Sequence, residues 1–376
     1  MTTEPSVEPR AGPNMPHELA DLLGRPPLLR TENPEAYKTF LSVVSHEFFH
    51  TWNVKQFRPA GIHPYDYLRE NYTDLLWVVE GTTSYYADLT NVRVGISKLD
   101  DYLKILSDAI HAMRNRPGAR VQSLAESSFD AWIKFSRSTP DDANFTVSFY
   151  DVGALASLLM DMELRSRTQN RVSLDDVMRE MYRRFPLSGN GYTTASMIAL
   201  LETISQSRWD DFFARYINGT DQYPFESALE TVGLDLSIQP EKKGDPIIQA
   251  SYAGLNLADR NGSAVVRSVL SDGPAYAAGV VLGDEIVAVN GRRVSASQFD
   301  ECIELLEPGD TVTLHIIRRD ELRTLSFKLA GKPNGRWTVV HMKDPTDSQK
   351  AAYQSWLHQE WPKKSSEGNY QAADLD

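Results

Sequence analysis

The sequence predicts an α + α/β multidomain protein in which a mainly helical domain precedes a smaller, β-rich domain. Apolar residues recur with a helical period from about residue 34 to residue 217, and no strong strand pattern precedes residue 240. A polar segment, 239–246, interrupts this pattern, and short β-like runs separated by turn signals follow it. A chain of 376 residues has the length for two or three domains.

Pro34 opens the first predicted helix, which we expect to run to about Phe57 because proline and glycine follow. A second helix is expected over residues 68–89. Further helical patterns cover 98–114, 147–166, 174–185, 195–205 and 209–217. We therefore assign residues 34–234 to the helical domain. The proline-rich residues 1–33 are expected to form an irregular lead-in.

The predicted β-rich domain covers residues 245–333. Its four β-like runs are 264–270, 285–289, 311–317 and 324–329. One helix, 296–306, lies among them, and Asn290-Gly291 supplies a tight turn. Residues 334–376 are expected to be a C-terminal tail.

Composition excludes several classes of function. The net charge is −12 and no Lys/Arg-rich run occurs, so we expect no nucleic-acid binding. The single cysteine, Cys302, excludes an intrachain disulfide and an all-cysteine metal site. No stretch of 18 apolar residues is present, so we expect no membrane span. No signal-like segment follows Met1, and we therefore expect a cytoplasmic protein.

The segment His46-Glu47-Phe48-Phe49-His50 is the strongest chemical signal in the chain. Two histidines four residues apart lie on one face of a helix, so both rings can reach one cation. Glu47 follows the first ligand and can reach a metal-bound water without itself binding the metal. The pattern is typical of a zinc hydrolase, although a helix can carry two histidines for other reasons.

A catalytic zinc ion needs a third protein ligand, and Glu80 is the leading candidate. It lies in an otherwise apolar and aromatic stretch, 76–86, where an unpaired carboxylate would be unfavourable. A solvent-exposed Glu80 is the alternative. Asp66, Glu70 and Asp88 are competitors for this role, whereas His63 and His111 have no motif around them and are expected to be ordinary surface or core histidines.

Two histidines and one carboxylate also describe non-haem iron sites. The intervening Glu47 favours zinc hydrolysis, because an oxygenase would not need a general base at that position. Zinc would lower the pKa of its bound water towards about 7, and Glu47 would accept the proton as the water attacks a carbonyl group. The developing oxyanion would need a further hydrogen-bond donor.

Several segments resemble the glycyl aminopeptidase family of gluzincin metallopeptidases. They are 46–55, Arg58-Pro59, 76–81, Tyr85-Tyr86, 128–134 and 149–155, and the resemblance extends over residues 35–357. It implies a thermolysin-like catalytic C-lobe that binds one Zn²⁺ ion through His46, His50 and Glu80, with Glu47 as the general base. It also implies that Tyr150, in a Tyr-x-x-Gly-Ala context, stabilises the oxyanion. The family commonly has Lys where this chain has Val152.

The N-terminal part departs from this family. Its members have a β-rich region before the zinc helix, with a Gly-rich, Glu-containing segment that recognises the substrate's free amine. Only about 34 residues precede the helix here, and they contain no such segment. We therefore expect an N-terminally shortened member, a lobe on another polypeptide, or a degenerate protein.

The β-rich domain resembles a PDZ domain of the bacterial protease-associated type through Gly273-Pro274-Ala275, 278–280 and 282–291. The resemblance implies that a peptide C-terminus or extended segment binds beside the helix 296–306. The peptide-binding loop would then be Gly254, Leu255, Asn256 and Leu257, with Asn256 where glycine is common. A domain that only packs against the catalytic part is the alternative.

Two hypotheses follow. The first is a zinc-dependent peptidase, an aminopeptidase for small N-terminal residues such as Gly or Ala, whose partners are peptide or protein substrates. The second is a catalytically impaired, N-terminally shortened pseudo-peptidase that acts as a PDZ peptide-binding scaffold. The short N-terminal region favours the second hypothesis. The first is favoured by the intact site residues His46, Glu47, His50, Glu80 and Tyr150.

Overall fold

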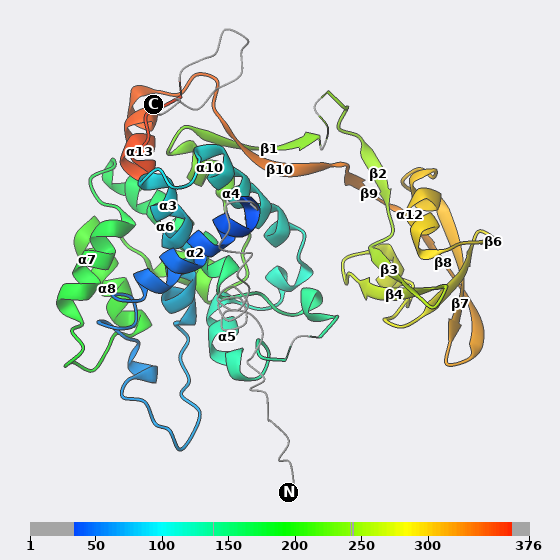
Figure 1. Ribbon diagram of the computed structural model, residues 1–376, viewed down its shortest axis with the longest axis horizontal. Helices are drawn as coiled ribbons and strands as arrows, with labels where there is room; N and C mark the ends of the chain where they lie inside the picture. The colour runs from blue at the N-terminus through cyan, green and yellow to red at the C-terminus, as the bar shows by residue number, and fades with distance from the viewer. Residues whose placement is uncertain (1–33, 138, 241, 243, 363–376) are drawn as a thin grey trace, which may run out of the picture.

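The computed structural model describes residues 34–137, 139–240, 242 and 244–362, and the predicted lead-in lies outside them. A helical region is followed by a β-rich, PDZ-like region, which confirms the predicted fold class (Figure 1). Each region has its own hydrophobic core. No helix among the described residues combines the length and apolar character needed to cross a membrane.

The helical domain is built around α6 (Asp151–Thr168), which is buried on nearly all sides, as expected for a central helix. Helix α3 packs on α6, and α2 packs on α3. Figure 1 shows α7 and α8 at one end of the domain. The other elements are α2 (Pro34–Phe49), a π-helical turn η3 (Trp77–Gly81), α3 (Thr82–Arg93), α4 (Leu99–Arg114), α5 (Leu124–Phe129), α7 (Leu174–Arg184), α8 (Thr194–Ser205), α9 (Asp210–Phe212), a second π-helical turn η7 (Phe213–Ile217) and α10 (Phe225–Glu230). Short 3-10 turns at 60–62, 117–120, 130–132 and 142–144 connect them.

The predicted end of the first helix was wrong. Helix α2 ends at Phe49, eight residues before the expected Phe57. The chain then makes a compact turn in which Val54 adopts a φ of 91°. This turn buries Asn53 and Phe57 almost completely, and burial of those two side chains outweighs continuation of the helix.

The predicted start of the second helix was also wrong. Residues 68–75 form a loop, and helical structure begins only at Leu76–Trp77. The side chains of Asp66 and Asn71 hold this loop, because Asn71 Oδ1 accepts a hydrogen bond from the Asp66 amide at 2.9 Å and Asp66 Oδ1 accepts one from the Leu68 amide at 3.0 Å. Such side-chain to backbone bonds compete with a helix.

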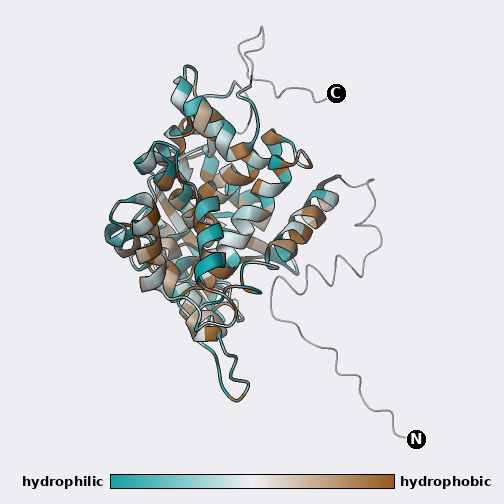
Figure 2. Ribbon diagram, turned by 90° about the vertical axis from the view of Figure 1, so that its left-hand side faces the viewer, coloured by the Kyte–Doolittle hydropathy of each residue, from teal (hydrophilic) through white to brown (hydrophobic). Residues whose placement is uncertain are grey.

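The surface of α2 remains partly uncovered by the described residues. In Figure 2, α2 is the helix that the grey N-terminal trace enters, and it carries hydrophobic positions at the edge of the molecule. Val44 and Phe48, four residues apart, are 44% and 62% exposed, and Trp52 in the following turn is 42% exposed. The cluster of His46 and His50 lies on the opposite, buried face of the same helix.

The PDZ-like domain is a sheet with strand order β3-β4-β5-β7-β8. The strands are β3 (Leu255–Arg260), β4 (Ser263–Val269), β5 (Glu285–Val289), β7 (Thr311–Arg318) and β8 (Glu321–Lys328), and β6 (Arg292–Arg293) pairs with β5. Helices α11 (Pro274–Ala277) and α12 (Ala296–Glu304) complete the domain. Four strands lie on predicted runs, whereas β3 was missed. Strand β3 lies at the edge of the sheet, and α12 packs beside it.

The PDZ-like domain is inserted into the helical domain. Strand β1 (Leu234–Pro240) pairs antiparallel with β10 (Gly335–His341), and β2 (Gln249–Tyr252) pairs with β9 (Ala330–Pro333). Two-stranded ribbons therefore carry the chain out to the PDZ-like domain and back (Figure 1). Strand β1 also begins before the position where we expected the first strand.

The prediction of a C-terminal tail over 334–376 was wrong for its described part. Strand β10 packs on α4, where the Val339 amide donates to Ser107 Oγ at 2.9 Å. Helix α13 (Asp347–Leu357) then buries Tyr353, Trp356 and Leu357 completely in the first core. These apolar residues are distant in sequence from their neighbours, so periodicity alone did not show that they return to this domain.

A second contact joins the two domains. Asn144, 1% exposed, donates from Nδ2 to the Val269 carbonyl at 2.8 Å and accepts from the Ser271 amide at 2.8 Å. Arg120 also forms an ion pair with Asp272 at 2.5 Å. The segment 269–272 that receives these contacts follows β4 directly.

The burial of Trp356 in α13 predicts that this side chain contributes to the free energy of unfolding. Trp356 Nε1 donates to the Tyr85 hydroxyl at 2.8 Å, and Arg93 Nε donates to the Trp356 carbonyl at 2.7 Å. Trp356→Ala should lower the free energy of unfolding by about 3–5 kcal/mol, the usual cost of truncating a buried Trp. Denaturant unfolding monitored by circular dichroism measures it. Trp132→Ala, at a site 56% exposed, is the matched control, and an equal loss in both variants would contradict the prediction.

Candidate metal centre

Two consecutive helical elements bring three ligand groups together. His46 lies in the last turn of α2, His50 directly follows the end of this helix, and Glu80 lies in the π-helical turn η3. Glu80 Oε2 is 3.2 Å from Nε2 of His46 and 3.2 Å from Nε2 of His50. The ligand atoms of the three residues all lie within 4.8 Å of one another, so one ion could contact all of them.

The second nitrogen of each imidazole is held by the protein. His50 Nδ1 lies 3.0 Å from the Asn53 carbonyl oxygen, and His46 Nδ1 lies 3.4 Å from Ser84 Oγ. The Ser84 hydroxyl also donates to the Glu80 carbonyl at 2.9 Å. Partners of this kind fix the orientation of a ligating ring, and here they direct both Nε2 atoms to the Glu80 carboxylate.

Asn53 joins the two ligand-bearing elements. Its Nδ2 donates to the carbonyl oxygens of Val78 and Val79 at 2.8 and 3.2 Å and lies 3.0 Å from Thr83 Oγ1. Its own carbonyl oxygen faces His50. One fully buried side chain therefore ties the turn after α2 to the π-helical turn that carries Glu80. Sequence analysis assigned no role to Asn53, because its partners are mostly backbone groups.

Charges in the cluster stabilise one another. Burial acts to raise the pKa of Glu80, but the hydrogen bonds with His46 and His50 outweigh it and lower the pKa to about 2. Burial acts to lower the pKa of His50, and the hydrogen bond and charge of Glu80 raise it above its ordinary value. In this arrangement an anionic carboxylate lies between two imidazoles. A divalent cation that binds here would take the place of the protons that the imidazoles carry.

Glu47 and Tyr150 lie beside the cluster. Glu47 is half-buried, and its charge raises the pKa of His50. Tyr150 directly precedes α6, and its ring centroid is 6.2 Å from that of His46. Burial raises the pKa of the Tyr150 phenol, as do the charge of Glu80, a hydrogen bond with it, and the charge of Glu47. Both residues are therefore close enough to the cluster to act on a molecule bound there.

The competing residues do not join this ligand group. Among the described residues, only His46, His50 and Glu80 form a group of three ligands. Asp66 holds the loop before η3, and Asp88 accepts a hydrogen bond from Ser42 at 2.7 Å. His111 Nδ1 lies 3.3 Å from the Trp337 amide on β10. These side chains have structural partners of their own.

Two glycines set the distance between the elements that carry Glu80 and Tyr150. A Cβ added at Gly81 would lie 2.5 Å from the Gly153 Cα and 2.7 Å from the Phe149 carbonyl oxygen. A Cβ added at Gly153 would lie 2.9 Å from the Gly81 Cα. The η3 turn and α6 therefore touch backbone to backbone next to the cluster, and a larger residue at either position would separate them.

In the PDZ-like domain, the predicted peptide-binding loop lies at the start of β3. Gly254 has a φ of +80°, and its carbonyl oxygen accepts from the Leu270 amide at 2.8 Å. Leu255 is buried, whereas Asn256 is exposed and donates to Ser268 Oγ at 3.0 Å. The loop is thus attached to the segment 269–272 that contacts the helical domain.

The helical domain thus presents two histidines, one in α2 and one directly after it, and a glutamate from η3 as a group that could hold a metal ion. Residues 39–156 match the M61 glycyl aminopeptidase family, and residues 251–329 match the PDZ domain family. The chain therefore contains an M61 glycyl aminopeptidase domain followed by a PDZ domain, which confirms the resemblance predicted from the sequence.

A solved aminopeptidase N family protein from Idiomarina loihiensis is similar to most of this chain. The TM-score is 0.75 at 30% sequence identity, and the match covers 86% of this chain and 55% of that protein. A probable periplasmic serine endoprotease, DegP-like, from Brucella suis is 32% identical over 117 residues, which are 31% of this chain and 21% of that protein. The chain thus spans about half of the first protein and a fifth of the second.

The glycine contact makes a prediction about metal binding. Gly81→Ala should separate η3 from α6 and move Glu80 relative to the two histidines, which should lower the affinity for a divalent ion by about tenfold, the lower end of effects outside the ligand set. Dialysis against buffered metal with elemental analysis measures it. Gly189→Ala is the control, since its Cβ would meet only the Pro186 carbonyl oxygen, at 3.2 Å. Unchanged affinity in Gly81→Ala would contradict the prediction.

Proposed function

We propose that this protein is a zinc-dependent peptidase, an aminopeptidase that removes small N-terminal residues such as Gly or Ala. The observation that carries the proposal is the convergence of His46, His50 and Glu80 within 4.8 Å in a domain of the M61 glycyl aminopeptidase family. Nitrogen and carboxylate ligands from three protein residues suit one zinc ion with an open position for water.

The chain's own residues take distinct roles in this proposal. His46, His50 and Glu80 hold the ion. Zinc, when bound, supplies a Lewis acid and lowers the pKa of a water molecule. Glu47 accepts a proton from the attacking water and passes it to the leaving amine.

Tyr150 donates its phenolic hydrogen to the developing oxyanion. A phenol carries its hydrogen at neutral pH, and burial together with the neighbouring carboxylates raises the pKa of Tyr150 further, so the group remains a donor. Its position at the start of α6, beside His46, supports this role.

The PDZ domain is proposed to bind a peptide C-terminus or an extended segment. Strand β3 lies at the edge of its sheet, and α12 forms the other wall beside it, which is the geometry of recognition by strand addition. Gly254, Leu255, Asn256 and Leu257 would present the binding loop. The second candidate function is a peptide-binding scaffold without catalysis, and this exposed edge is the observation that favours it.

The role of Glu47 is tested by Glu47→Gln. This change preserves size and removes the proton acceptor, so hydrolysis of glycyl and alanyl amides should fall at least about a thousandfold while zinc content stays at one ion per chain. Activity with a chelator control and elemental analysis are measured on the same samples.

Glu321→Gln, an exposed substitution in the PDZ domain, is the control for Glu47→Gln. Activity of Glu47→Gln within tenfold of the parent would reject the role. Absence of hydrolysis in the parent protein with zinc bound, together with peptide binding at the PDZ domain, would favour the scaffold.

The role of Tyr150 is tested by Tyr150→Phe, which removes only the hydroxyl group. If that hydroxyl stabilises the oxyanion, kcat should fall by about 10²–10³-fold with little change in KM. If the ring is only a packing residue, kcat should stay near the parent value, and steady-state kinetics on the same amides separates the two outcomes.

A further inference from the structure

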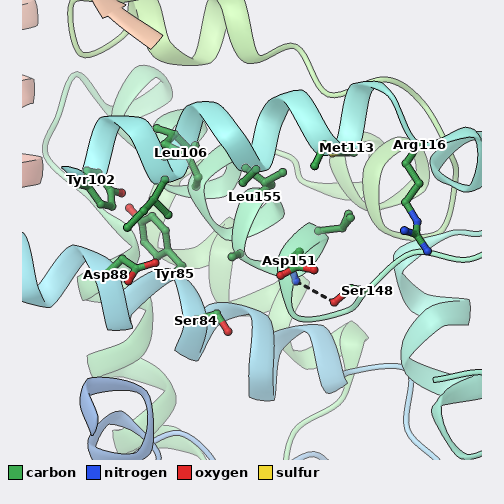
Figure 3. A pocket seen from close by; sticks show the side chains of 16 residues that line it. Ser84, Tyr85, Asp88, Tyr102, Leu106, Met113, Arg116, Ser148, Asp151 and Leu155 are labelled. Carbon is green, nitrogen blue, oxygen red and sulfur yellow. Dashed lines mark hydrogen bonds between the residues drawn. The ribbon is translucent and has the colours of Figure 1, made fainter. Parts of the chain in front are cut away.

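A cavity of about 390 Å³ lies next to the candidate metal centre, between α3, α4 and α6 (Figure 3). A neighbouring cavity of about 410 Å³ contains His46 and Tyr150. The two cavities have four polar residues in common, which we call the shared rim: Ser84, Asp88, Ser148 and Asp151. The first cavity therefore borders, at the shared rim, the cavity that contains His46.

Beyond the shared rim, the cavity is mainly apolar and aromatic. Residues from the facing helices α3, α4 and α6 form these walls: Tyr85, Tyr102, Leu106, Ala109, Leu155 and Leu158. Its volume lies within the roughly 300–1,000 Å³ that is typical of ligand pockets, and a few polar groups beside apolar walls are also typical. The cavity can therefore accept an apolar stem several carbon atoms long.

The charge at the rim is negative. Asp88 Oδ1 accepts a hydrogen bond from the Ser42 hydroxyl at 2.7 Å. Within the described part of the chain, neither Asp88 nor Asp151 forms an ion pair. Arg116 also lines the cavity, and its guanidinium donates to the Thr146 carbonyl at 2.6 Å. Burial lowers the pKa of Arg116, and the charges of Asp142 and Asp151 act against this, so Asp151 lies within electrostatic range of a cation. Burial raises the pKa of Asp88, although Ser42 and His46 act against it. Asp151 is exposed, whereas Asp88 is half-buried at an apolar cavity and has no ion-pair partner among the described residues, so Asp88 in particular favours a ligand that brings a cation.

We propose that this cavity binds a positively charged group of the substrate carried on an apolar stem, with the carboxylates of Asp88 and Asp151 as its counter-charges. The inference rests on the proposed function, since the shared rim opens beside His46. Two parts of a peptide have this chemistry: a Lys or Arg side chain next to the scissile bond, and the α-ammonium group of an N-terminal residue.

A binding experiment tests the charge without requiring catalysis. Pentylamine and 1-pentanol have the same stem and differ in charge, so the full-length protein should bind pentylamine more tightly by about tenfold, the worth of a hydrogen-bonded charge. The Asp88→Asn/Asp151→Asn double variant should lose this preference. Asp211→Asn, at an exposed carboxylate on α9, should keep it. Titration calorimetry and heteronuclear NMR report the affinities.

Equal binding of the two probes to the parent protein would overturn the proposal, as would an unchanged preference in the double variant. A second variant, Ala109→Phe, fills the cavity from α4 and leaves both carboxylates intact. It should weaken pentylamine binding by about tenfold, whereas Ala199→Phe on the exposed face of α8 should not. Equal affinity in both Phe variants would place the amine outside this cavity.

Substrate kinetics then identify the source of the charge. If the cavity takes a basic side chain, alanyl-lysine amide should be cleaved with a higher kcat/KM than alanyl-norleucine amide, by about tenfold, and Asp88→Asn should reduce that ratio. If it takes the α-ammonium group, both amides should lose activity equally in Asp88→Asn, with the loss in KM. No hydrolysis of any amide by the parent protein would reject the proposed function, while the pentylamine result would still decide this inference.

Discussion

The candidate metal centre depends on the contact of the Glu80 carboxylate with the two imidazoles, whose Nε2 atoms both lie 3.2 Å from Glu80 Oε2. The two histidines are fixed relative to each other by their spacing on α2, whereas Glu80 must be positioned by tertiary contacts. Asn53 ties its turn to the end of α2, and the Gly81–Gly153 contact ties the same turn to α6. A π-helical turn at this point is consistent with the frequent occurrence of such turns at functional sites.

The insertion of the PDZ domain has consequences for how the two domains are connected. A domain at the end of a chain is held by one linker, but this one is held by two antiparallel ribbons and by Asn144. The segment that contains Asn144 continues through Ser148 to Tyr150 at the start of α6. The residue that contacts the PDZ domain and the tyrosine beside the metal centre are thus six positions apart on one short stretch of chain.

The cavity beside the candidate metal centre has a polar rim and mainly apolar walls. Polar groups at the rim face a cavity whose remaining walls are apolar, and both lie on helices packed into the main core. Since α3, α4 and α6 also carry much of that core, the cavity is bordered by rigid elements rather than by loops.

Local patterns in the sequence determined the fold class, most helix positions, the His46 and His50 pair and the resemblance of both domains, because helical periodicity and short motifs act over a few residues. The loop at 68–75 depends on local bonds from the Asp66 and Asn71 side chains to nearby backbone amides. The end of α2 and the roles of Asn53 and Gly153 were decided by tertiary structure, since their partners lie 25 to 72 residues away. The same holds for β3, β10 and α13. Whether a strand or helix pairs with one domain or another depends on contacts between distant segments, and no local pattern records them.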